Sequence, residues 1–200
     1  MRVLIAYESS GTVREAFRKL GHEAWSCDLQ PADDGSIYHL TMDAKTAIRE
    51  TTVRLGHWDL IIMHPPCTAL CVSGNRHYGK GKPKHNQRLK AIEYTLEMFE
   101  LAKKCADAVC MENPVGVLPI KASQYIQPWQ FGHGECKKTG FWLHNLPKLQ
   151  PTDIVEGREQ RIWKLGPSPD RWKIRSKTYQ GVANAMASQF FTHITTEEEK

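Results

Sequence analysis

A cysteine and a glutamate, each placed just after an apolar segment, are the residues of this sequence that best suit catalysis. Cys67 follows the apolar run Leu60–Met63 and the turn residues His64–Pro66. Glu112 directly follows a second apolar run, Ala108–Met111. A cysteine thiolate can act as a nucleophile, and a carboxyl group can transfer a proton or hydrogen-bond a polar ring edge. The two residues therefore predict a nucleophile with an acid beside it.

Both apolar runs predict strands that are buried on two faces of a parallel sheet. Because proline cannot donate to a strand ladder, the first strand must end before Pro65. Cys67 then lies just past the carboxyl end of a central strand, where open α/β sheets bind their ligands. Each residue has a structural alternative, since buried cysteines are usually inert and Glu112 alone would suit a helix cap or a loop. Their placement at two strand ends favours a functional site.

A metal site is the alternative for the same region. His64, Cys67 and Cys71 offer imidazole and thiolate ligands. The sequence has no second cysteine pair at the spacing of a zinc ribbon and no third nearby cysteine for an iron–sulfur site. We therefore predict that no metal is bound here.

The N-terminal residues predict half of a nucleotide-binding fold. Arg2–Tyr7 is a short apolar strand, and the tight turn Glu8–Gly11 leads into a helix with apolar residues at helical spacing over Val13–Leu20. A second strand, His22–Cys27, ends at Asp28. Strand, turn, helix and strand, with an acidic residue at this distance, is the layout of a Rossmann-like half.

The turn after the first strand lacks two of the three glycines of the dinucleotide fingerprint. Their absence argues against the close approach of a pyrophosphate, and a ligand made of an adenosine and a carboxylate fits better. In such a site Asp28 could hold ribose hydroxyls, and Asp43 could accept a hydrogen bond from an exocyclic amine. Either aspartate alone would be an ordinary surface residue.

The segment 73–90 is unlike the rest of the chain, with six Lys or Arg residues, no acid and three glycines. A solvated loop is the default interpretation of such a charge run. Its position after Cys67 favours a mobile lid that closes on a phosphate backbone. Further basic residues are interleaved with Trp172 and Tyr179. The residues predicted to contact this phosphate backbone are Arg76, Lys80, Lys82, Lys84, Arg88, Lys138, Arg171, Arg175 and Lys177.

The remaining segments complete a single α/β domain over residues 1–200, in which we see no repeat or linker. Residues 147–178 are rich in proline and charge and predict irregular structure. The other expected elements are a loop over 30–42, helices over 43–55 and from Asn86 onward, a hairpin or strand pair within 130–143, and a last helix over 181–191.

The bulk composition sets wide limits on function. A formal net charge of +5 and a pI near 8.9 permit a polyanionic partner without requiring one. No run of 18 apolar residues predicts a membrane span, and the N-terminus lacks a signal-peptide cleavage site. Six cysteines without regular spacing are typical of reduced intracellular thiols, so we expect a cytoplasmic protein.

Taken together, these residues resemble the DNA (cytosine-5)-methyltransferase family, in a compact form like those found in phage genomes. AYESSGTVREAF, residues 6–17, looks like the first motif of that family. HPPCTALC, residues 64–71, matches its Pro-Cys nucleophile motif, and MENP, residues 111–114, matches its Glu-Asn-Val motif. The order and spacing agree across nearly the whole chain.

The resemblance implies a Rossmann-like methyltransferase fold, a mostly parallel sheet with helices on both faces. It also implies S-adenosyl-L-methionine as cofactor, DNA as partner, and a covalent mechanism in which Cys67 attacks carbon 6 of cytosine while Glu112 holds the ring nitrogen and amino edge. The implied catalytic residues are Cys67, Glu112, Asn113 and Lys137. The implied cofactor-binding residues are Tyr7, Glu8, Ser9, Ser10, Gly11, Asp28, Leu29, Asp43, Pro65 and Asn184.

The chain also departs from the family. The Gln-x-Arg-x-Arg motif should fall near ECKKT, residues 135–139, where Lys137 replaces the first arginine; REQR, residues 158–161, is an alternative match. The final motif is only echoed in GVANA, residues 181–185. Only residues 147–178 stand where a large target-recognition domain would be. Sequence selectivity should therefore be low or supplied by a partner. Single-stranded or distorted DNA, which lowers the cost of base flipping, should be preferred.

Three rival functions stay open at this point. A free cytosine nucleotide as substrate would explain the missing recognition domain. A catalytically silent protein that binds S-adenosylmethionine or DNA would explain the altered Gln-x-Arg-x-Arg region. A metal-dependent hydrolase would require stoichiometric zinc.

Overall fold

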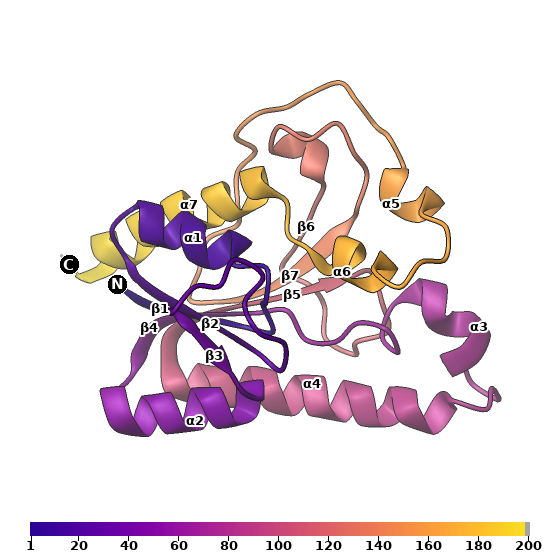
Figure 1. Cartoon of the computed structure of the whole chain (residues 1–200), viewed down its shortest axis with the longest axis horizontal. Coiled ribbons are helices and arrows are strands. Elements are labelled where there is room, and N and C mark those ends of the chain that lie inside the picture. The colour runs from indigo at the N-terminus through magenta and orange to yellow at the C-terminus, as the bar shows by residue number, and fades with distance from the viewer. Residues whose placement is uncertain (199–200) are drawn as a thin grey trace.

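The computed structural model of the protein describes residues 1–198, with side chains described to Ile194, and is built on one seven-stranded sheet (Figure 1). Its strands are β1 (Arg2–Ala6), β2 (Glu23–Asp28), β3 (His39–Thr41), β4 (Trp58–Met63), β5 (Ala106–Pro114), β6 (Gln124–Ile126) and β7 (Thr139–His144). They lie in the order β3-β2-β1-β4-β5-β7-β6. The first five strands are parallel, whereas β7 is antiparallel to β5 and to β6. This mostly parallel, Rossmann-like topology confirms the predicted α/β class.

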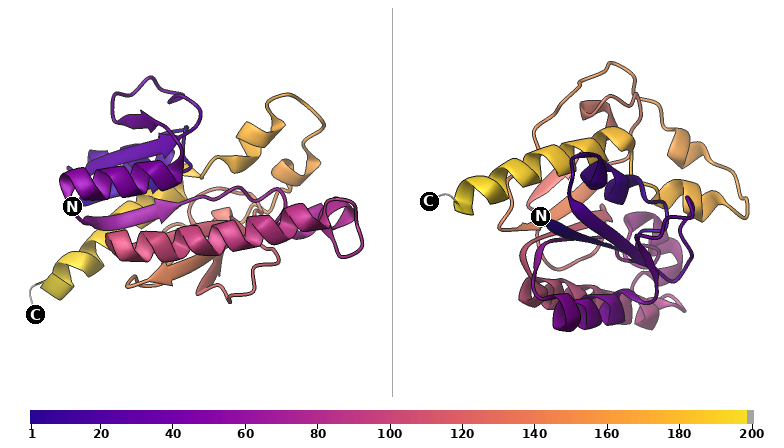
Figure 2. Two further views of the ribbon diagram at one scale, coloured as in Figure 1. Left: turned by 90° about the horizontal axis from the view of Figure 1, so that it is seen from below. Right: turned by 60° about the vertical axis from the view of Figure 1, so that its left-hand side comes forward.

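Four helices cover the sheet, two on each face (Figures 1 and 2). Helices α1 (Thr12–Lys19) and α7 (Gln180–Glu198) lie on one face, and α2 (Ala44–Leu55) and α4 (His85–Cys105) lie on the other. Strand β1 has apolar side chains on both faces because it is buried between these layers: Val3 and Ile5 join the core under α1 and α7, and Leu4 and Ala6 join the core over α2 and α4.

Five short helical segments lie in the connections. They are η1 (Val72–Gly74) and α3 (Asn75–Tyr78) between β4 and α4, η2 (Pro128–Gln130) between β6 and β7, and α5 (Arg161–Lys164) and α6 (Arg171–Ser176) before α7. The long connection from β7 to α7 projects from the sheet as an irregular arm (Figure 1). The expectation of irregular structure there is confirmed, apart from the two short helices.

The strand order reverses beside β1, because β2 lies on one side of it and β4 on the other. Open α/β sheets bind ligands outside the carboxyl ends of the strands at such a switch point. Ala6 is paired with Met63, and Met63 with Met111. The residues that follow them in β1, β4 and β5 therefore emerge at one level of the same edge.

Two sequence-based expectations for secondary structure were wrong in part. Residues 30–42 are not wholly loop, because His39–Thr41 pairs with the end of β2. The strand pair expected within 130–143 exists, but its first strand is Gln124–Ile126 and lies before that range. The last helix begins where expected and extends further, to Glu198.

Candidate active site

The loop that carries Cys67 is held in place from β5 and α4. The Asn113 side-chain amide donates to the Pro65 carbonyl at 3.0 Å, and Arg88 donates to the Ala69 carbonyl at 2.7 Å. The Cys67 carbonyl itself accepts hydrogen bonds from the amides of residues 70 and 71. The Pro-Cys segment is therefore a fixed turn just beyond β4.

Cys67 is largely buried beside a negative charge. Burial raises the pKa of its thiol, the charge of Glu112 raises it further, and the net value is about 11 even though Lys137 opposes the shift. The resting form is therefore the thiol. A nucleophilic role requires that a bound substrate or a proton acceptor draws the proton away.

Glu112 makes a contact that the sequence did not reveal. It is the first residue of β5 beyond the Met63–Met111 pair, and His64 is the first residue after β4. Their side chains therefore meet, with His64 Nδ1 at 2.9 Å from Glu112 Oε2 and both nearly buried, 10% and 14% exposed. Burial raises the pKa of Glu112, but the hydrogen bond and charge of His64 and the charge of Lys137 outweigh it, so the net pKa lies below its usual range.

Lys137 reaches this pair from the connection before β7. Its amine donates to the Lys177 carbonyl at 3.3 Å and lies 5.9 Å from the centre of the Tyr179 ring. A pocket beside Glu112 is lined by Lys137, Thr139, Thr178 and Tyr179, with an apolar floor that includes Phe141. The pocket thus combines an acid, a cation and hydroxyl groups against an apolar wall.

The two segments that compete for the Gln-x-Arg-x-Arg motif lie against each other. Glu135 and Glu159 form an isolated bridge, and Arg161 Nε donates to the Glu135 carboxylate at 3.1 Å. Tyr179 also donates to Glu135, at 2.6 Å. These contacts fasten the arm to the β6–β7 connection, and from the ECKKT segment it is Lys137 whose charge acts on Glu112 and Cys67.

The turn after β1 has a strained backbone and an internal carboxylate. Tyr7 and Gly11 both have positive φ, 62° and 69°. Both carboxylate oxygens of Glu8 accept backbone hydrogen bonds at the start of α1, from Val13 at 2.7 Å and Arg14 at 3.2 Å. Glu8 is only 5% exposed. This is a correction to its predicted role, because Glu8 shapes the turn and neutralises the helix end instead of facing a ligand.

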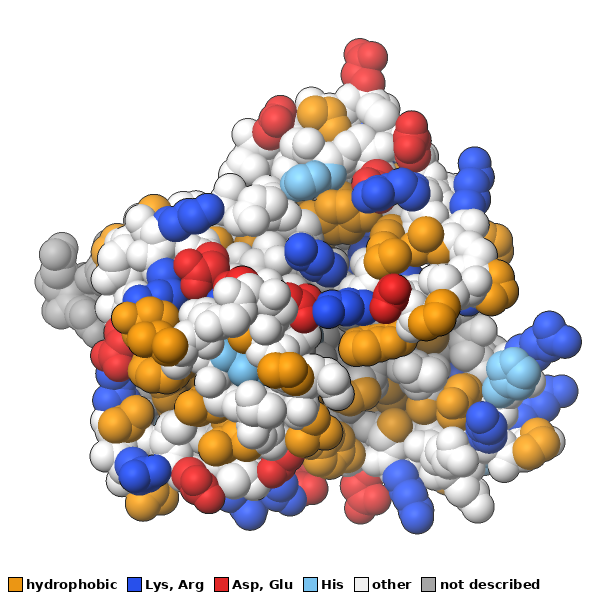
Figure 3. All heavy atoms as spheres, in the orientation of Figure 1, with side chains coloured by type: hydrophobic (Ala, Val, Ile, Leu, Met, Phe, Trp, Pro, Cys, Tyr) orange, Lys and Arg blue, Asp and Glu red, His pale blue; other side chains and the backbone are white. Residues whose placement is uncertain are grey.

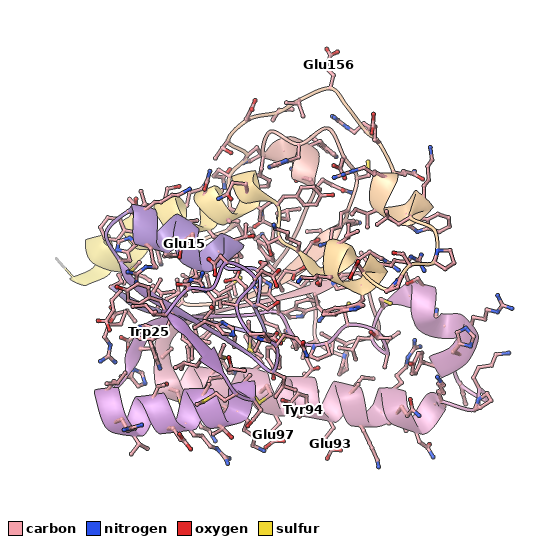
Figure 4. The ribbon with its side chains drawn as sticks, in the orientation of Figure 1. Glu15, Trp25, Glu93, Tyr94, Glu97 and Glu156 are labelled. Atoms are coloured by element: carbon pink, nitrogen blue, oxygen red, sulfur yellow. The ribbon has the colours of Figure 1, made fainter. Side chains whose placement is uncertain are left out.

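The other predicted cofactor residues lie around the same edge. Asp28 ends β2, followed by Leu29, which is 70% exposed. Asp43 caps α2 by accepting from the Thr46 amide at 3.0 Å, and this hydrogen bonding lowers the pKa of Asp43. Tyr7 lies below the turn, where its hydroxyl meets that of Tyr94 of α4 at 2.9 Å; Tyr94 is labelled in Figure 4. Ser9, Ser10 and Pro65 flank these residues at the ends of β1 and β4, and Asn184 lies exposed on the first turns of α7.

The predicted DNA-contacting residues fall into an exposed group, a second group in which Arg171 and Arg175 are partly buried, and one exception. Arg76, Lys80, Lys82 and Lys84 are exposed around α3 and the start of α4, toward the right of Figure 3. Arg171, Arg175 and Lys177 lie on and after α6, and exposed Lys138 stacks 4.8 Å from the ring of Tyr125.

Arg88 is the exception. It is 5% exposed and bonds to Ala69, Asn75 and Cys71. Its predicted DNA contact is corrected accordingly, because its buried guanidinium holds the Cys67 loop.

Among the side chains that the structure describes, which end at Ile194, no group of three or more His, Cys, Asp or Glu could hold a metal ion. In the same part of the chain, no helix is long and apolar enough to cross a membrane.

The fold defines the chain as a Rossmann-like α/β protein, with Cys67 and Glu112 at the carboxyl edge of its sheet. No protein-family model and no curated protein sequence matches it. Among solved structures, a SAM-dependent methyltransferase from Neisseria gonorrhoeae aligns over 71% of this chain and 60% of its own, with 12% identity and a TM-score of 0.43. The Dnmt2 methyltransferase of S. pombe aligns over 82% of this chain and 54% of its own, with 17% identity and a TM-score of 0.47. This chain therefore spans between half and two thirds of the length of both.

Proposed function

We propose that this protein transfers a methyl group from S-adenosyl-L-methionine to carbon 5 of cytosine in DNA, through a covalent adduct at Cys67. The observation that carries the proposal is the convergence of Cys67, Glu112 and Lys137 at one carboxyl edge, beside a pocket of suitable chemistry. These groups are a nucleophile, an acid and a cation, which addition to a pyrimidine ring requires.

The turn after β1 suits a cofactor without phosphates. In dinucleotide-binding folds the free amides at the first helix N-terminus receive a phosphate. Here the amides of Val13 and Arg14 are taken by the internal carboxylate of Glu8. Asp28, Leu29 and Asp43 remain at the edge to hold ribose hydroxyls, an adenine face and an exocyclic amine. Bound there, S-adenosylmethionine would supply an electrophilic methyl group.

The protein groups perform the remaining steps. The Cys67 thiol gives up its proton to an acceptor and Sγ bonds to carbon 6 of cytosine, and the displaced C5–C6 electron pair makes carbon 5 nucleophilic. Glu112 hydrogen-bonds the ring nitrogen and the amino group, and Lys137 offsets the developing negative charge. After methyl transfer a base removes the carbon 5 proton, and the Sγ–C6 bond breaks to restore the aromatic ring and the cysteine.

The basic groups around α3 and α6 support a polymeric substrate, since each offers cations for a phosphate backbone. Cytosine in a duplex must be flipped out before Cys67 can attack, at a cost of a few kcal/mol. In this chain only residues 147–178 stand where a recognition domain would stabilise the flipped state, so it should act faster on single-stranded DNA.

The test is transfer of a labelled methyl group from S-adenosylmethionine to single-stranded DNA, duplex DNA and free cytosine nucleotides. We expect label on carbon 5 of DNA cytosine, with activity that falls steeply as salt rises. Label on the nucleotide alone would favour the rival substrate. Cofactor binding with no label on any cytosine would favour the silent binder.

A further inference from the structure

The His64–Glu112 pair carries an inference that deepens the proposed function and rests on it. The two side chains extend from neighbouring parallel strands and share one hydrogen bond of 2.9 Å. His64 Nε2 is buried and, among the described residues, has no hydrogen-bond partner. A buried polar atom without a partner is costly. Its retention beside the proposed acid needs a functional reason.

Cytosine chemistry supplies that reason. The ring nitrogen N3 of neutral cytosine is a hydrogen-bond acceptor, and a carboxylate has no proton to offer it. Addition of a thiolate at carbon 6 pushes negative charge onto the ring, and a proton placed on N3 neutralises that charge. Glu112 must therefore carry or receive a proton at the moment of attack.

Glu112 alone is poorly suited to hold that proton at neutral pH, since an ordinary glutamic acid is ionised there. Lys137 disfavours the protonated acid further. An imidazole bonded to the carboxylate changes the situation, because its Nδ1 can hold a proton and pass it along the hydrogen bond to Glu112. The pair can then exist as imidazolium and carboxylate, or as imidazole and carboxylic acid, with one mobile proton in both forms.

We propose that His64 is the proton reserve of the active site, delivering its Nδ1 proton to Glu112 as Glu112 protonates N3 of the bound cytosine. Before attack the pair is imidazolium and carboxylate, with its one mobile proton on Nδ1. As the Sγ–C6 bond forms, the Nδ1 proton moves to Glu112 and Glu112 gives it to N3, which leaves a neutral imidazole and a carboxylate. When the Sγ–C6 bond breaks, N3 returns the proton to Glu112, and Glu112 returns it to Nδ1. His64 thus donates and regains the same proton within each turnover, and no external acid is consumed.

Other titratable groups also face this pair. Cys67 approaches from the β4 loop, Cys110 from β5 itself, and Lys137 from the β6–β7 connection, while Tyr179 lines the adjoining pocket. Burial raises the pKa of Cys110 well above its usual range, so it stays a thiol. Cys67 affects activity at every pH in both wild type and variants, so the ratio of variant to wild-type activity isolates the pair.

The experiment compares His64→Asn with the wild type across pH 5.5 to 8.5 in the methyl-transfer assay. Asparagine keeps an N–H donor near the position of Nδ1 but has no proton to lend. At pH 8 we expect a loss on the order of 100-fold, the range of acid catalysis. The deficit should shrink by up to about tenfold per pH unit on acidification, because protonated Glu112 then becomes more abundant.

A matched control exists on the same two strands. His57 and Asp107 form an equivalent pair, Nδ1 to Oδ1 3.0 Å, exposed at the opposite edge of β4 and β5. His57→Asn should leave activity and its pH profile unchanged. A ¹³C titration of the Glu112 carboxyl gives a second readout, in which loss of His64 should raise its pKa. If His64→Asn fails to fold, His64→Gln takes its place.

Two results would overturn the inference while leaving the proposed function intact. One is a loss of methyl-transfer activity in His64→Asn that is the same at every pH. The other is activity of His64→Asn within about threefold of wild type at pH 8, where acid catalysis predicts a larger loss. Wild-type protein that methylates no cytosine substrate would instead overturn the proposed function, and the inference with it.

Discussion

The reactivity of Cys67 should depend on the two charges beside it in opposite directions. Its thiol has a pKa of about 11, raised first by burial and then by the charge of Glu112, and lowered by Lys137. Glu112→Gln removes the negative neighbour and should lower the thiol pKa. Lys137→Gln removes the positive neighbour and should raise it. A charged group at short range changes the pKa of a neighbouring thiol by about one unit or more.

The expected change in the alkylation rate of Cys67 is the balance of two opposing effects. A pKa lower by one unit raises the thiolate fraction about tenfold at pH 8, while the lower basicity reduces nucleophilicity about threefold. Glu112→Gln should therefore speed alkylation of Cys67 by roughly threefold, and Lys137→Gln should slow it by a similar factor. In the unmodified protein the rate should rise about tenfold per pH unit between pH 7 and 10.

The assay is iodoacetamide labelling at fixed pH, followed by mass spectrometry of the peptide that contains Cys67. Glu93→Gln is the matched control, because this exposed glutamate of α4, labelled in Figure 4, makes the same chemical change away from the site. A rate for Cys67 that is flat between pH 6 and 10 would refute the reasoning, because it would mean a thiolate already formed at neutral pH. So would equal rates for the two charge variants.

Four further variants separate residues that position the site from residues that bind DNA or the cofactor. Asn113→Ala removes the hydrogen bond to Pro65 and should destabilise the protein by about 1 kcal/mol, while methyl transfer falls more than cofactor affinity. Arg88→Gln should lower the free energy of unfolding by about 2 kcal/mol, since it breaks buried charged hydrogen bonds, and should leave the salt dependence of DNA binding unchanged. Lys82→Gln should reduce the slope of log affinity against log salt concentration by about one, without loss of stability. Gly11→Ala should weaken cofactor binding in calorimetry and lower stability by about 1–3 kcal/mol, because φ is +69° there.

Each of these variants has a result that would contradict the prediction made for it. Unchanged turnover in Asn113→Ala would mean that the Pro-Cys turn keeps its conformation without the hydrogen bond from Asn113. A salt slope that falls in Arg88→Gln but not in Lys82→Gln would return Arg88 to the DNA surface. Unchanged cofactor affinity in Gly11→Ala would mean that the turn after β1 does not contact the cofactor.

Local patterns in the sequence sufficed for most of the fold. Continuous apolar runs marked β1, β4 and β5 because these strands are buried on both faces, and Asp43 marked the start of α2 because it caps the helix. The edge strand His39–Thr41 was missed because three residues are too few for a period to appear. The strand pair β6–β7 was misplaced because glycines inside its long connection resemble the turn of a hairpin.

Only those site residues that a local sequence pattern marks could be predicted. Cys67 and Glu112 could be found because each follows an apolar run. The partnership of His64 with Glu112 depends on the register between β4 and β5, which are 48 residues apart at this contact, and no local pattern encodes it. Arg88 was misassigned for a related reason, since a basic run does not reveal which of its members turns inward.

The most direct measurement of the central claim uses single-stranded DNA that carries 5-fluorocytosine, incubated with the protein and S-adenosylmethionine. Fluorine at carbon 5 cannot be removed as a proton, so the adduct formed by a cysteine nucleophile should persist. We expect a covalent protein–DNA complex whose cross-linked peptide contains Cys67, and none with Cys67→Ala. A protein that methylates cytosine yet forms no such complex, or forms it through another cysteine, would contradict the account.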